Sequence, residues 1–295
     1  MKNSAFILFI LLFCSLDLKA QWDTIQIKTI SLTSDIHVLK GRGGNIGVFT
    51  GEDGVFMIDS QFGPLSEKIL NAVRELSDAP VRFLFNTHWH GDHTGGNENI
   101  HDAGATVIAH ENVYKRLKAK EIKKADGTVE NLPAGALPEI TFDHQMYFHI
   151  NGKTVRVIHF HDGGHTDGDA IVYFEADNIL HMGDLFFESR YPYIDISSGG
   201  NVDDLISTLN QSLLLVNDDT RIIPGHGIIT NRASLMTYRD MIHDVRNKVK
   251  AQVDAGKTLE EIQEMELSKA YDEKYGGGFI KKDRFITAIY RSFRD

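Results

Sequence analysis

The sequence predicts an α+β fold, with sheets covered by outer helices within a single large domain. Two observations indicate this. Short apolar runs bounded by glycine and other turn residues recur along the chain, as is typical of strands. Amphipathic helical segments are interspersed among them, and short turns join neighbouring strands in both halves, as expected for sheets that contain hairpins.

The first half of the chain is expected to contain strands at residues 35–40, 46–51 and 54–59, separated by turns at Gly43-Gly44 and Asp53-Gly54. An amphipathic helix is predicted from Leu65 to Leu76. The apolar runs 81–86 and 105–110 predict buried strands, and a helix follows at 111–120. Residues 123–139 contain turn residues and no hydrophobic period, which predicts a surface loop.

The second half repeats the strand pairs. Asn151-Gly152 is a strong hairpin signal between strands at 146–150 and 154–160, and strands at 170–176 and 178–184 repeat that pattern. A helix is expected from Val202 to Val216. A strand and turn follow at 220–227, and helices dominate from Arg232 onward.

Residues 1–20 have the build of a secretory signal peptide, which leaves residues 21–295 as the mature domain. Lys2 precedes an apolar run that is too short for a membrane span, and a small residue, Ala20, ends the segment. An uncleaved membrane anchor is the alternative. A lipid anchor at Cys14 is disfavoured because bulky Phe13 precedes it. The protein is therefore expected to be exported, periplasmic or secreted, without stable membrane insertion after cleavage.

Charge and cysteine content restrict the partners. Cleavage changes the 31 basic and 41 acidic residues to 29 and 40, a net charge of −11. A chain with this much negative charge binds phosphate backbones poorly, so nucleic acid is not an expected partner. The expected partner is a small-molecule substrate. Cleavage also removes Cys14, the only cysteine, so any metal must be held by imidazole and carboxylate groups. The oligomeric state is left open.

Four potential metal ligands follow the buried strand 81–86: His88, His90, Asp92 and His93. His88 and His90 point the same way in an extended chain and can share one ion. Gly91 permits a sharp turn, after which Asp92 and His93 can face a second position. Since one tetrahedral ion rarely takes adjacent residues, this spacing predicts two ions.

Three later apolar strands also end in a potential ligand beside glycine, namely His165, Asp184 and His226. The common layout predicts that strand ends bring all these ligands to one rim. Other histidines on or near strands, His159, His161 and His181, are interpreted as structural. Asp59 has two open interpretations: a carboxylate that orients a ligand, or an ordinary turn residue after a strand.

The motif "HWHGDH" resembles the H-x-H-x-D-H motif of the metallo-β-lactamase superfamily, and "GGHTDGD", "MGDLFF", "PGHG" and "MIDS" resemble its other motifs in the right order. The resemblance covers about Asp35 to His226. It implies an αβ/βα four-layer sandwich of two mixed sheets with outer helices. It also implies that one zinc ion is held by His88, His90 and His165, and a second by Asp92, His93 and His226, with Asp184 bridging them.

The implied reaction is hydrolysis by a hydroxide that bridges the two ions, with Asp92 as the catalytic residue that orients it. Asp184 departs from the cysteine or serine of true β-lactamases and resembles the aspartate of lactonases and thioesterases. We therefore expect a cyclic amide, lactone or ester as substrate, without a natural substrate being assigned. The alternatives are an iron oxidoreductase on the same fold and a binding protein that retains metal without turnover.

Two segments are candidates for the substrate pocket. Residues 185–199 follow Asp184, and their aromatic residues Phe186, Phe187, Tyr191 and Tyr193 form either a pocket wall or an ordinary packing cluster. Arg190 in the same segment is a candidate for binding a substrate carboxylate. Residues 41–45, "GRGGN", form either a mobile flap or a plain hairpin turn.

Overall fold

The computed structural model describes residues 22–124, 126–160 and 163–294. The predicted signal peptide at residues 1–20 lies outside these ranges, and so does His161. No helix in the described ranges has the length and apolar character needed to cross a membrane.

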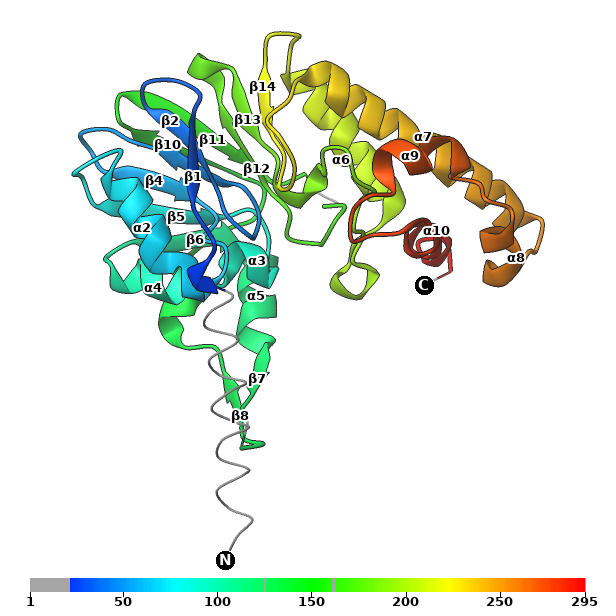
Figure 1. Ribbon diagram of the computed structural model, residues 1–295, viewed down its shortest axis with the longest axis horizontal. Helices are drawn as coiled ribbons and strands as arrows, with labels where there is room; N and C mark the ends of the chain where they lie inside the picture. The colour runs from blue at the N-terminus through cyan, green and yellow to red at the C-terminus, as the bar shows by residue number, and fades with distance from the viewer. Residues whose placement is uncertain (1–21, 125, 161–162, 295) are drawn as a thin grey trace, which may run out of the picture.

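Two mixed sheets stand face to face in the middle of the molecule (Figure 1). The first has seven strands in the order β1 (Lys28–Ser31), β2 (Ile36–Lys40), β3 (Ile46–Phe49), β4 (Val55–Ile58), β5 (Val81–Asn86), β6 (Thr106–His110) and β9 (Ile140–Phe142). β1 to β4 pair antiparallel, and β4, β5, β6 and β9 pair parallel.

The second sheet has five strands in the order β10 (Gln145–Ile150), β11 (Lys153–Ile158), β12 (Ile171–Phe174), β13 (Ile179–His181) and β14 (Arg221–Ile223). The first four pair antiparallel as consecutive hairpins, and Asn151 and Gly152 form the predicted turn between β10 and β11 with positive φ angles. β14 pairs parallel with β13 and so brings its carboxyl end to the same edge.

Alternation along the strands explains why the sheets form layers. Along β4, Phe56 and Ile58 face the second sheet, whereas Val55 and Met57 face the outer helices. Phe56 meets Phe148 of β10 edge to face, with ring centroids 4.8 Å apart. The apolar core between the sheets therefore fixes their mutual position, which in turn fixes the loops at their edges.

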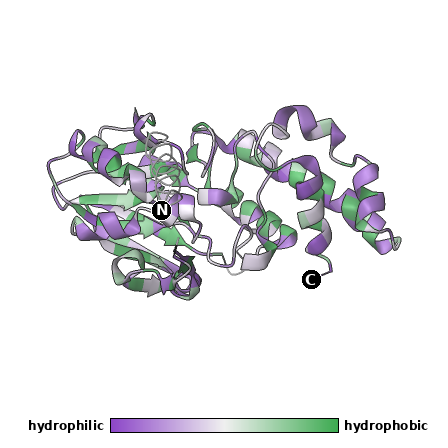
Figure 2. Ribbon diagram, turned by 60° about the horizontal axis from the view of Figure 1, so that its bottom comes forward, coloured by the Kyte–Doolittle hydropathy of each residue, from purple (hydrophilic) through white to green (hydrophobic). Residues whose placement is uncertain are grey.

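Helices cover both outer faces, which confirms the predicted α+β sandwich (Figure 1). On the first sheet these are α2 (Ser66–Arg74), α4 (Asn97–Asp102) and α5 (Glu111–Ala119); on the second they are α6 (Val202–Leu215) and α7 (Arg232–Asp254). α10 (Lys282–Arg291) packs against α7, and α8 (Leu259–Glu264) packs against α10. Short α9 (Asp272–Tyr275) packs among the last of these. In Figure 2 the C-terminal helices carry both hydrophilic and hydrophobic colours along their length, as amphipathic helices do.

The predicted surface loop at residues 123–139 is wrong in part. It contains β8 (Val129–Asn131), which pairs antiparallel with β7 (Glu121–Lys123), and a short 3-10 turn at Ala134–Ala136. Asp126 accepts hydrogen bonds from the backbone and the hydroxyl of Thr128 and so tightens the turn between the strands. The strands were missed because each has three exposed residues and no apolar alternation.

Candidate metal centre

The predicted ligands come from four loops at one rim of the sandwich. β5 leads to His88 and His90 and then to the short helix α3 (Gly91–Thr94), which carries Asp92 and His93. β11 precedes the loop of His165, and β13 leads to the 3-10 turn Gly183–Leu185 with Asp184. β14 is followed by His226. Strand ends thus deliver the ligands, as the sequence predicts.

Glycine is required where two of these loops meet. A methyl group on Gly225 would lie only 2.0 Å from Oδ1 of Asp184, so the strand end before His226 could not approach the cluster with any larger residue. Gly183 has a positive φ of 51° and lies against Thr87, which allows the turn of Asp184 to meet the loop of His88.

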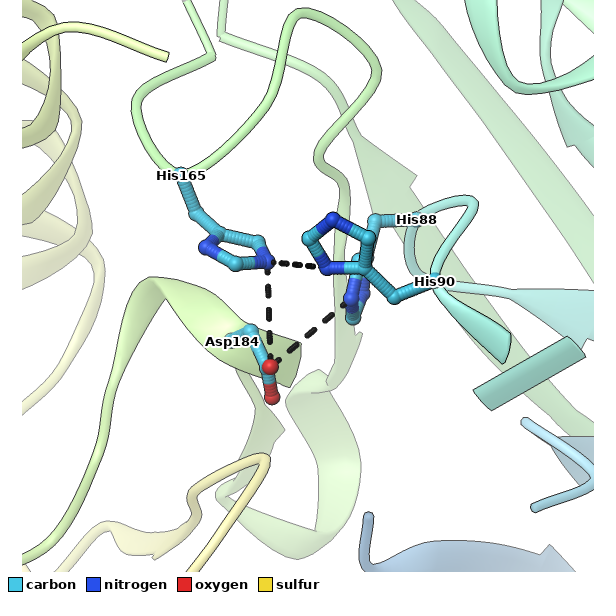
Figure 3. Close-up of side chains that lie close together, drawn as sticks. All are labelled: His88, His90, His165 and Asp184. Carbon is cyan, nitrogen blue, oxygen red and sulfur yellow. Dashed lines mark hydrogen bonds and ion pairs between the residues drawn. The ribbon is translucent and has the colours of Figure 1, made fainter. Parts of the chain in front are cut away.

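The structure brings all seven predicted ligands together in two groups. Within each group the ligand atoms lie within 4.8 Å of one another: His88, His90, His165 and Asp184 form the first group, and Asp92, His93 and His226 form the second. Figure 3 shows the first group, with the imidazoles of His90 and His165 side by side above Asp184.

Asp184 lies between the two groups. Its Oδ2 is 3.7 Å from Nε2 of both His88 and His165, in the first group. Its Oδ1 is 3.1 Å from Nε2 of His93 and 3.5 Å from Nε2 of His226, in the second. One carboxylate oxygen therefore faces each group, which is the geometry expected of a bridging ligand.

In the first group, the second ring nitrogen of each histidine contacts the protein, which fixes how the imidazole faces the centre. Nδ1 of His165 bonds to the carbonyl oxygen of Tyr193 at 2.5 Å. Nε2 of His90 lies 2.9 Å from Oδ2 of Asp195, and Nδ1 of His88 lies 3.1 Å from the hydroxyl of Thr87. Their other nitrogens are left for the centre.

Asp59 orients His93, so the ligand-orienting interpretation of this residue agrees with the geometry. Its Oδ2 lies 2.7 Å from Nδ1 of His93 and also accepts a hydrogen bond from the hydroxyl of Thr87. Asp59 follows β4 with a positive φ of 64°, a conformation that non-glycine residues adopt rarely and mainly where the surroundings enforce it.

Three buried polar atoms support occupation by metal. Nε2 of His88, Nε2 of His93 and Oδ1 of Asp184 make no hydrogen bond of acceptable geometry within the described structure, although the last two are only 3.1 Å apart. Buried polar atoms without partners are costly and rare. Of seven such side-chain atoms in the described residues, these three belong to the ligand groups, so the residues present fit divalent cations.

The protonation of three ligands, His88, His165 and Asp184, also suits metal. Burial, with the nearby imidazole of His93, holds the pKa of His88 well below its usual value, and burial lowers the pKa of His165 to about 4. Burial opposes the ionisation of Asp184, but His93 and His226 hold its pKa well below the usual range. Neutral imidazoles and an ionised carboxylate are the forms that bind metal.

His93 and His226 differ from these histidines. Burial opposes the protonation of His93, but the carboxylates of Asp184 and Asp59 hold its pKa well above the usual value. Burial also opposes the protonation of His226, but the carboxylates of Asp184 and Asp92 raise the pKa of His226 to about 9. Nε2 of His226 lies 3.2 Å from Oδ2 of Asp92. Metal binding at the second group is therefore coupled to proton release.

Asp195 and Thr87 are the functional residues that sequence reasoning missed. Asp195 is buried, and the hydroxyls of Ser197 and Ser198 donate to its two oxygens at 2.5 and 2.6 Å. Although burial opposes ionisation, its hydrogen bonds with His90 and the two serines hold the pKa of Asp195 well below the usual range. An aspartate followed by two serines is not a sequence pattern typical of metal centres, so the sequence does not indicate this role of Asp195.

The structural interpretation of the remaining histidines agrees with their contacts. His181 is fully buried outside both ligand groups, and its Nε2 lies 3.1 Å from the carbonyl oxygen of Asn45. Nδ1 of His159 lies 2.8 Å from the carbonyl oxygen of Asp169.

A pocket of about 760 Å³ lies over the centre. Apart from ligands, it is lined by aromatic and cationic side chains, together with Gly91, Asp195 and Ser197; the aromatic and cationic ones are Arg42, Phe62, Trp89, Arg190, Tyr193 and Phe279. Of the two interpretations of the aromatic segment, the pocket wall holds for Tyr193. The packing cluster holds for Phe186, Phe187 and Tyr191, which are buried in the core on the helical side. Residues 41–45 form the turn between β2 and β3, and Gly44 donates a backbone hydrogen bond to the carbonyl oxygen of Asp92.

The chain matches known proteins over the region that carries these ligands. A hydroxyacylglutathione hydrolase of Nitrosococcus oceani is 30% identical over 179 residues, which span 60% of this chain and 60% of that relative. The metallo-beta-lactamase IND-1 of Chryseobacterium indologenes is 24% identical over 208 residues, 66% of this chain and 80% of the relative.

The fold is shared with solved structures. The sec-alkylsulfatase Pisa1 from Pseudomonas sp. superposes with a TM-score of 0.71 at 17% identity, covering 90% of this chain and 50% of that one. This coverage reaches into the C-terminal helices. A model of the metallo-beta-lactamase superfamily matches residues 39–226, more than half of the chain. The chain therefore belongs to the metallo-beta-lactamase superfamily.

Proposed function

We propose that this protein is a dinuclear zinc hydrolase that opens a cyclic amide, lactone or ester. The observation that carries the proposal is the position of Asp184, which presents one carboxylate oxygen to each of two complete ligand groups. His88, His90 and His165 would hold the first ion, and Asp92, His93 and His226 the second, with Asp184 between them. When bound, such ions lower the pKa of water and polarise a carbonyl oxygen.

Asp92 is the proposed catalytic residue of the chain. It lines the pocket and is partly exposed, and its Oδ2 faces His226. Burial opposes the ionisation of Asp92, but His93 and His226 lower its pKa, so the carboxylate is ionised at neutral pH. The ionised carboxylate can then accept a hydrogen bond from the attacking group and orient it toward the substrate carbonyl group.

The walls of the pocket orient the substrate. Phe62, Trp89, Tyr193 and Phe279 offer apolar surface to the body of a small molecule, and a volume of about 760 Å³ suits such a ligand. The relatives include a hydroxyacylglutathione hydrolase and a β-lactamase, which supports acyl hydrolysis as the reaction class. We rank lactones and esters above β-lactams because Asp184 resembles the aspartate of lactonases.

We also propose that the reaction takes place after export, on the basis of the signal-like residues 1–20. N-terminal sequencing of protein recovered from outside the cytoplasm should begin at Gln21. Recovery of the intact N-terminus from the cytoplasmic fraction would contradict export. An acidic chain of this kind is expected to act on a small molecule and not on nucleic acid.

The test of the proposed function is a panel of β-lactam, lactone, aryl ester and phosphodiester substrates with zinc-loaded protein. We expect turnover of a lactone or an ester that is lost in the Asp92→Asn variant, together with about two zinc ions per chain by elemental analysis. One iron and no zinc in gently purified protein would support the oxidoreductase alternative. Zinc-loaded protein that turns over none of the panel would support a binding role.

A further inference from the structure

A second hollow adjoins the pocket over the metal centre. Its volume is about 400 Å³, and its lining includes Trp89, Asn112, Arg116, Lys120 and Asp167. Trp89 lines both hollows and lies between the ligands His88 and His90 in the sequence. The indole of Trp89 therefore forms part of the wall of both hollows, which places the second hollow beside the pocket over the metal centre.

The wall of the second hollow is tied to the metal centre. Nε and Nη2 of Arg116 donate to the two oxygens of Asp167 at 2.7 Å each, a bidentate ion pair. The side chain of Asn112 donates to the carbonyl oxygen of Asp167 at 2.8 Å. Because Asp167 lies two residues after His165, these bonds hold α5 against the loop that carries a ligand.

Lys120 is a cationic side chain of the lining that takes no part in the hydrogen bonds of Arg116, Asn112 and Asp167. It lies half-buried just after the last residue of α5, and its Nζ is 5.8 Å from the ring centroid of Trp89. Within the described part of the chain, no ion pair or hydrogen bond involves this ammonium group. The other lysine of the lining, Lys115, is exposed and lies 3.8 Å from Glu111.

The local charge is opposite to that of the whole protein. Three cationic side chains, Lys115, Arg116 and Lys120, line the hollow against one carboxylate, Asp167, whereas the chain has a net charge of −10. Anions are attracted to a cationic hollow, whereas the acidic remainder of the protein surface repels them. The indole of Trp89 adds an apolar surface beside the ammonium group.

We propose that this hollow, the Lys120 subsite, binds a carboxylate at the far end of the substrate while the scissile bond lies over the metal centre. The proposal rests on the proposed function and narrows its substrate class to elongated acyl compounds with a terminal carboxylate. Lys120 accepts the charge, and the indole of Trp89 packs against the apolar segment that joins the carboxylate to the scissile group.

Binding is tested first, because it does not depend on turnover. The chain has two tryptophans, so a Trp22→Phe background leaves Trp89 as the only one. Zinc-loaded protein is titrated with hexanoate and with its neutral counterpart hexanamide while tryptophan fluorescence is recorded. We expect a saturable change with hexanoate, with an affinity at least about 10-fold lower in Lys120→Gln, as for a lost hydrogen bond to a charged group.

The matched control is Lys118→Gln, which alters an exposed lysine in the last turn of α5, two residues before Lys120. Nζ of Lys118 lies 5.3 Å from the ring centroid of Tyr114. The variant should bind hexanoate like the parent. Equal responses to hexanoate and hexanamide would overturn the proposal. So would a hexanoate response that persists in Lys120→Gln, since the carboxylate would then be bound by the metal ions or by Arg190 in the pocket over them.

Turnover supplies the second measurement. Two aryl esters with acyl chains of equal length are compared, one ending in a carboxylate and the other in a carboxamide. The ratio of their kcat/KM values should fall about 10- to 100-fold in Lys120→Gln, through KM, and stay unchanged in Lys118→Gln. If both esters are hydrolysed and the ratio stays constant in both variants, the subsite fails and the proposed function stands. If neither ester is hydrolysed, the proposed function loses support and the binding titration decides on the subsite.

Discussion

Oδ2 of Asp59 lies 2.7 Å from Nδ1 of His93, and both side chains are fully buried. This contact joins the end of β4 to the helix that follows β5, so the first sheet itself orients a metal ligand. The proton on Nδ1 points to the carboxylate, which leaves Nε2 toward the metal centre.

Asp59→Asn should weaken zinc binding at the second ligand group by about 10- to 100-fold, because the amide replaces the charged acceptor that holds His93. Zinc affinity is measured by competition with a chelator, and circular dichroism checks that the fold is intact. Asp102→Asn is the control, since its carboxylate is exposed on α4. Equal zinc affinity in a folded Asp59→Asn variant would remove Asp59 from the metal centre.

His226→Ala should empty one metal position and leave the other mostly occupied. His226 contacts Asp92 and faces only Oδ1 of Asp184, whereas His88, His90 and His165 do not depend on it. The zinc content should fall from about two ions to about one per chain, measured by elemental analysis after dialysis. Loss of both ions from a folded variant would contradict the division into two groups.

Asp184→Asn should reduce turnover by about 10- to 100-fold or more and weaken the second ion, because the amide keeps the shape but loses the negative charge and one good donor oxygen. The values of kcat/KM for a lactone or ester and for a β-lactam are measured on the same zinc-loaded preparations. We expect weak β-lactam hydrolysis beside the lactone or ester activity. Efficient β-lactam turnover alone would reverse this ranking, and an unchanged rate and metal content would exclude Asp184.

Stability should fall in mild acid because of His110, which is buried and stacks on His159 with ring centroids 3.8 Å apart. Burial, with the neighbouring ring of His159, lowers the pKa of His110 to about 4. Between pH 6.5 and 4 the unfolded chain therefore binds more protons at this position than the folded chain does. The free energy of unfolding is unaffected by the titration of His110 above pH 6.5 and decreases as the pH falls through this window. The cost between pH 7.5 and 5 is about 2 kcal/mol.

The His110→Asn variant tests this prediction because asparagine can still accept the hydrogen bond that Nδ1 of His110 takes from the backbone of Asn112 at the start of α5. Urea unfolding at both pH values should show a smaller acid loss in His110→Asn than in the parent. His243→Asn, an exposed position on α7, should behave like the parent. The same acid loss in His110→Asn and the parent would refute the assignment.

The sequence predicted much of the fold and the candidate ligands because both produce patterns among residues that are close together in the chain. An apolar run followed by glycine and a polar residue marks a strand end, and β5 spans the predicted residues 81–86. The ligands His88 to His93 lie within six residues, so their chemistry was visible before any contact was known. The strands β1 and β9 were not predicted, since each is short and exposed along much of its length.

Only the tertiary structure decided which side chains surround the metal ligands. Asp195 meets His90 across 105 residues of sequence, and no short-range pattern records such a pair. Tertiary packing also decided which aromatic residues after Asp184 face the pocket. Tyr191 stacks on Phe285 of α10 in the core, whereas Tyr193 lines the pocket. A sequence determines locally where strands end and which ligands follow them, because hydrophobic period and glycine act over a few residues. The partners of those ligands depend on the packing of sheets and helices that are distant in the chain, and this packing exists only in the folded protein.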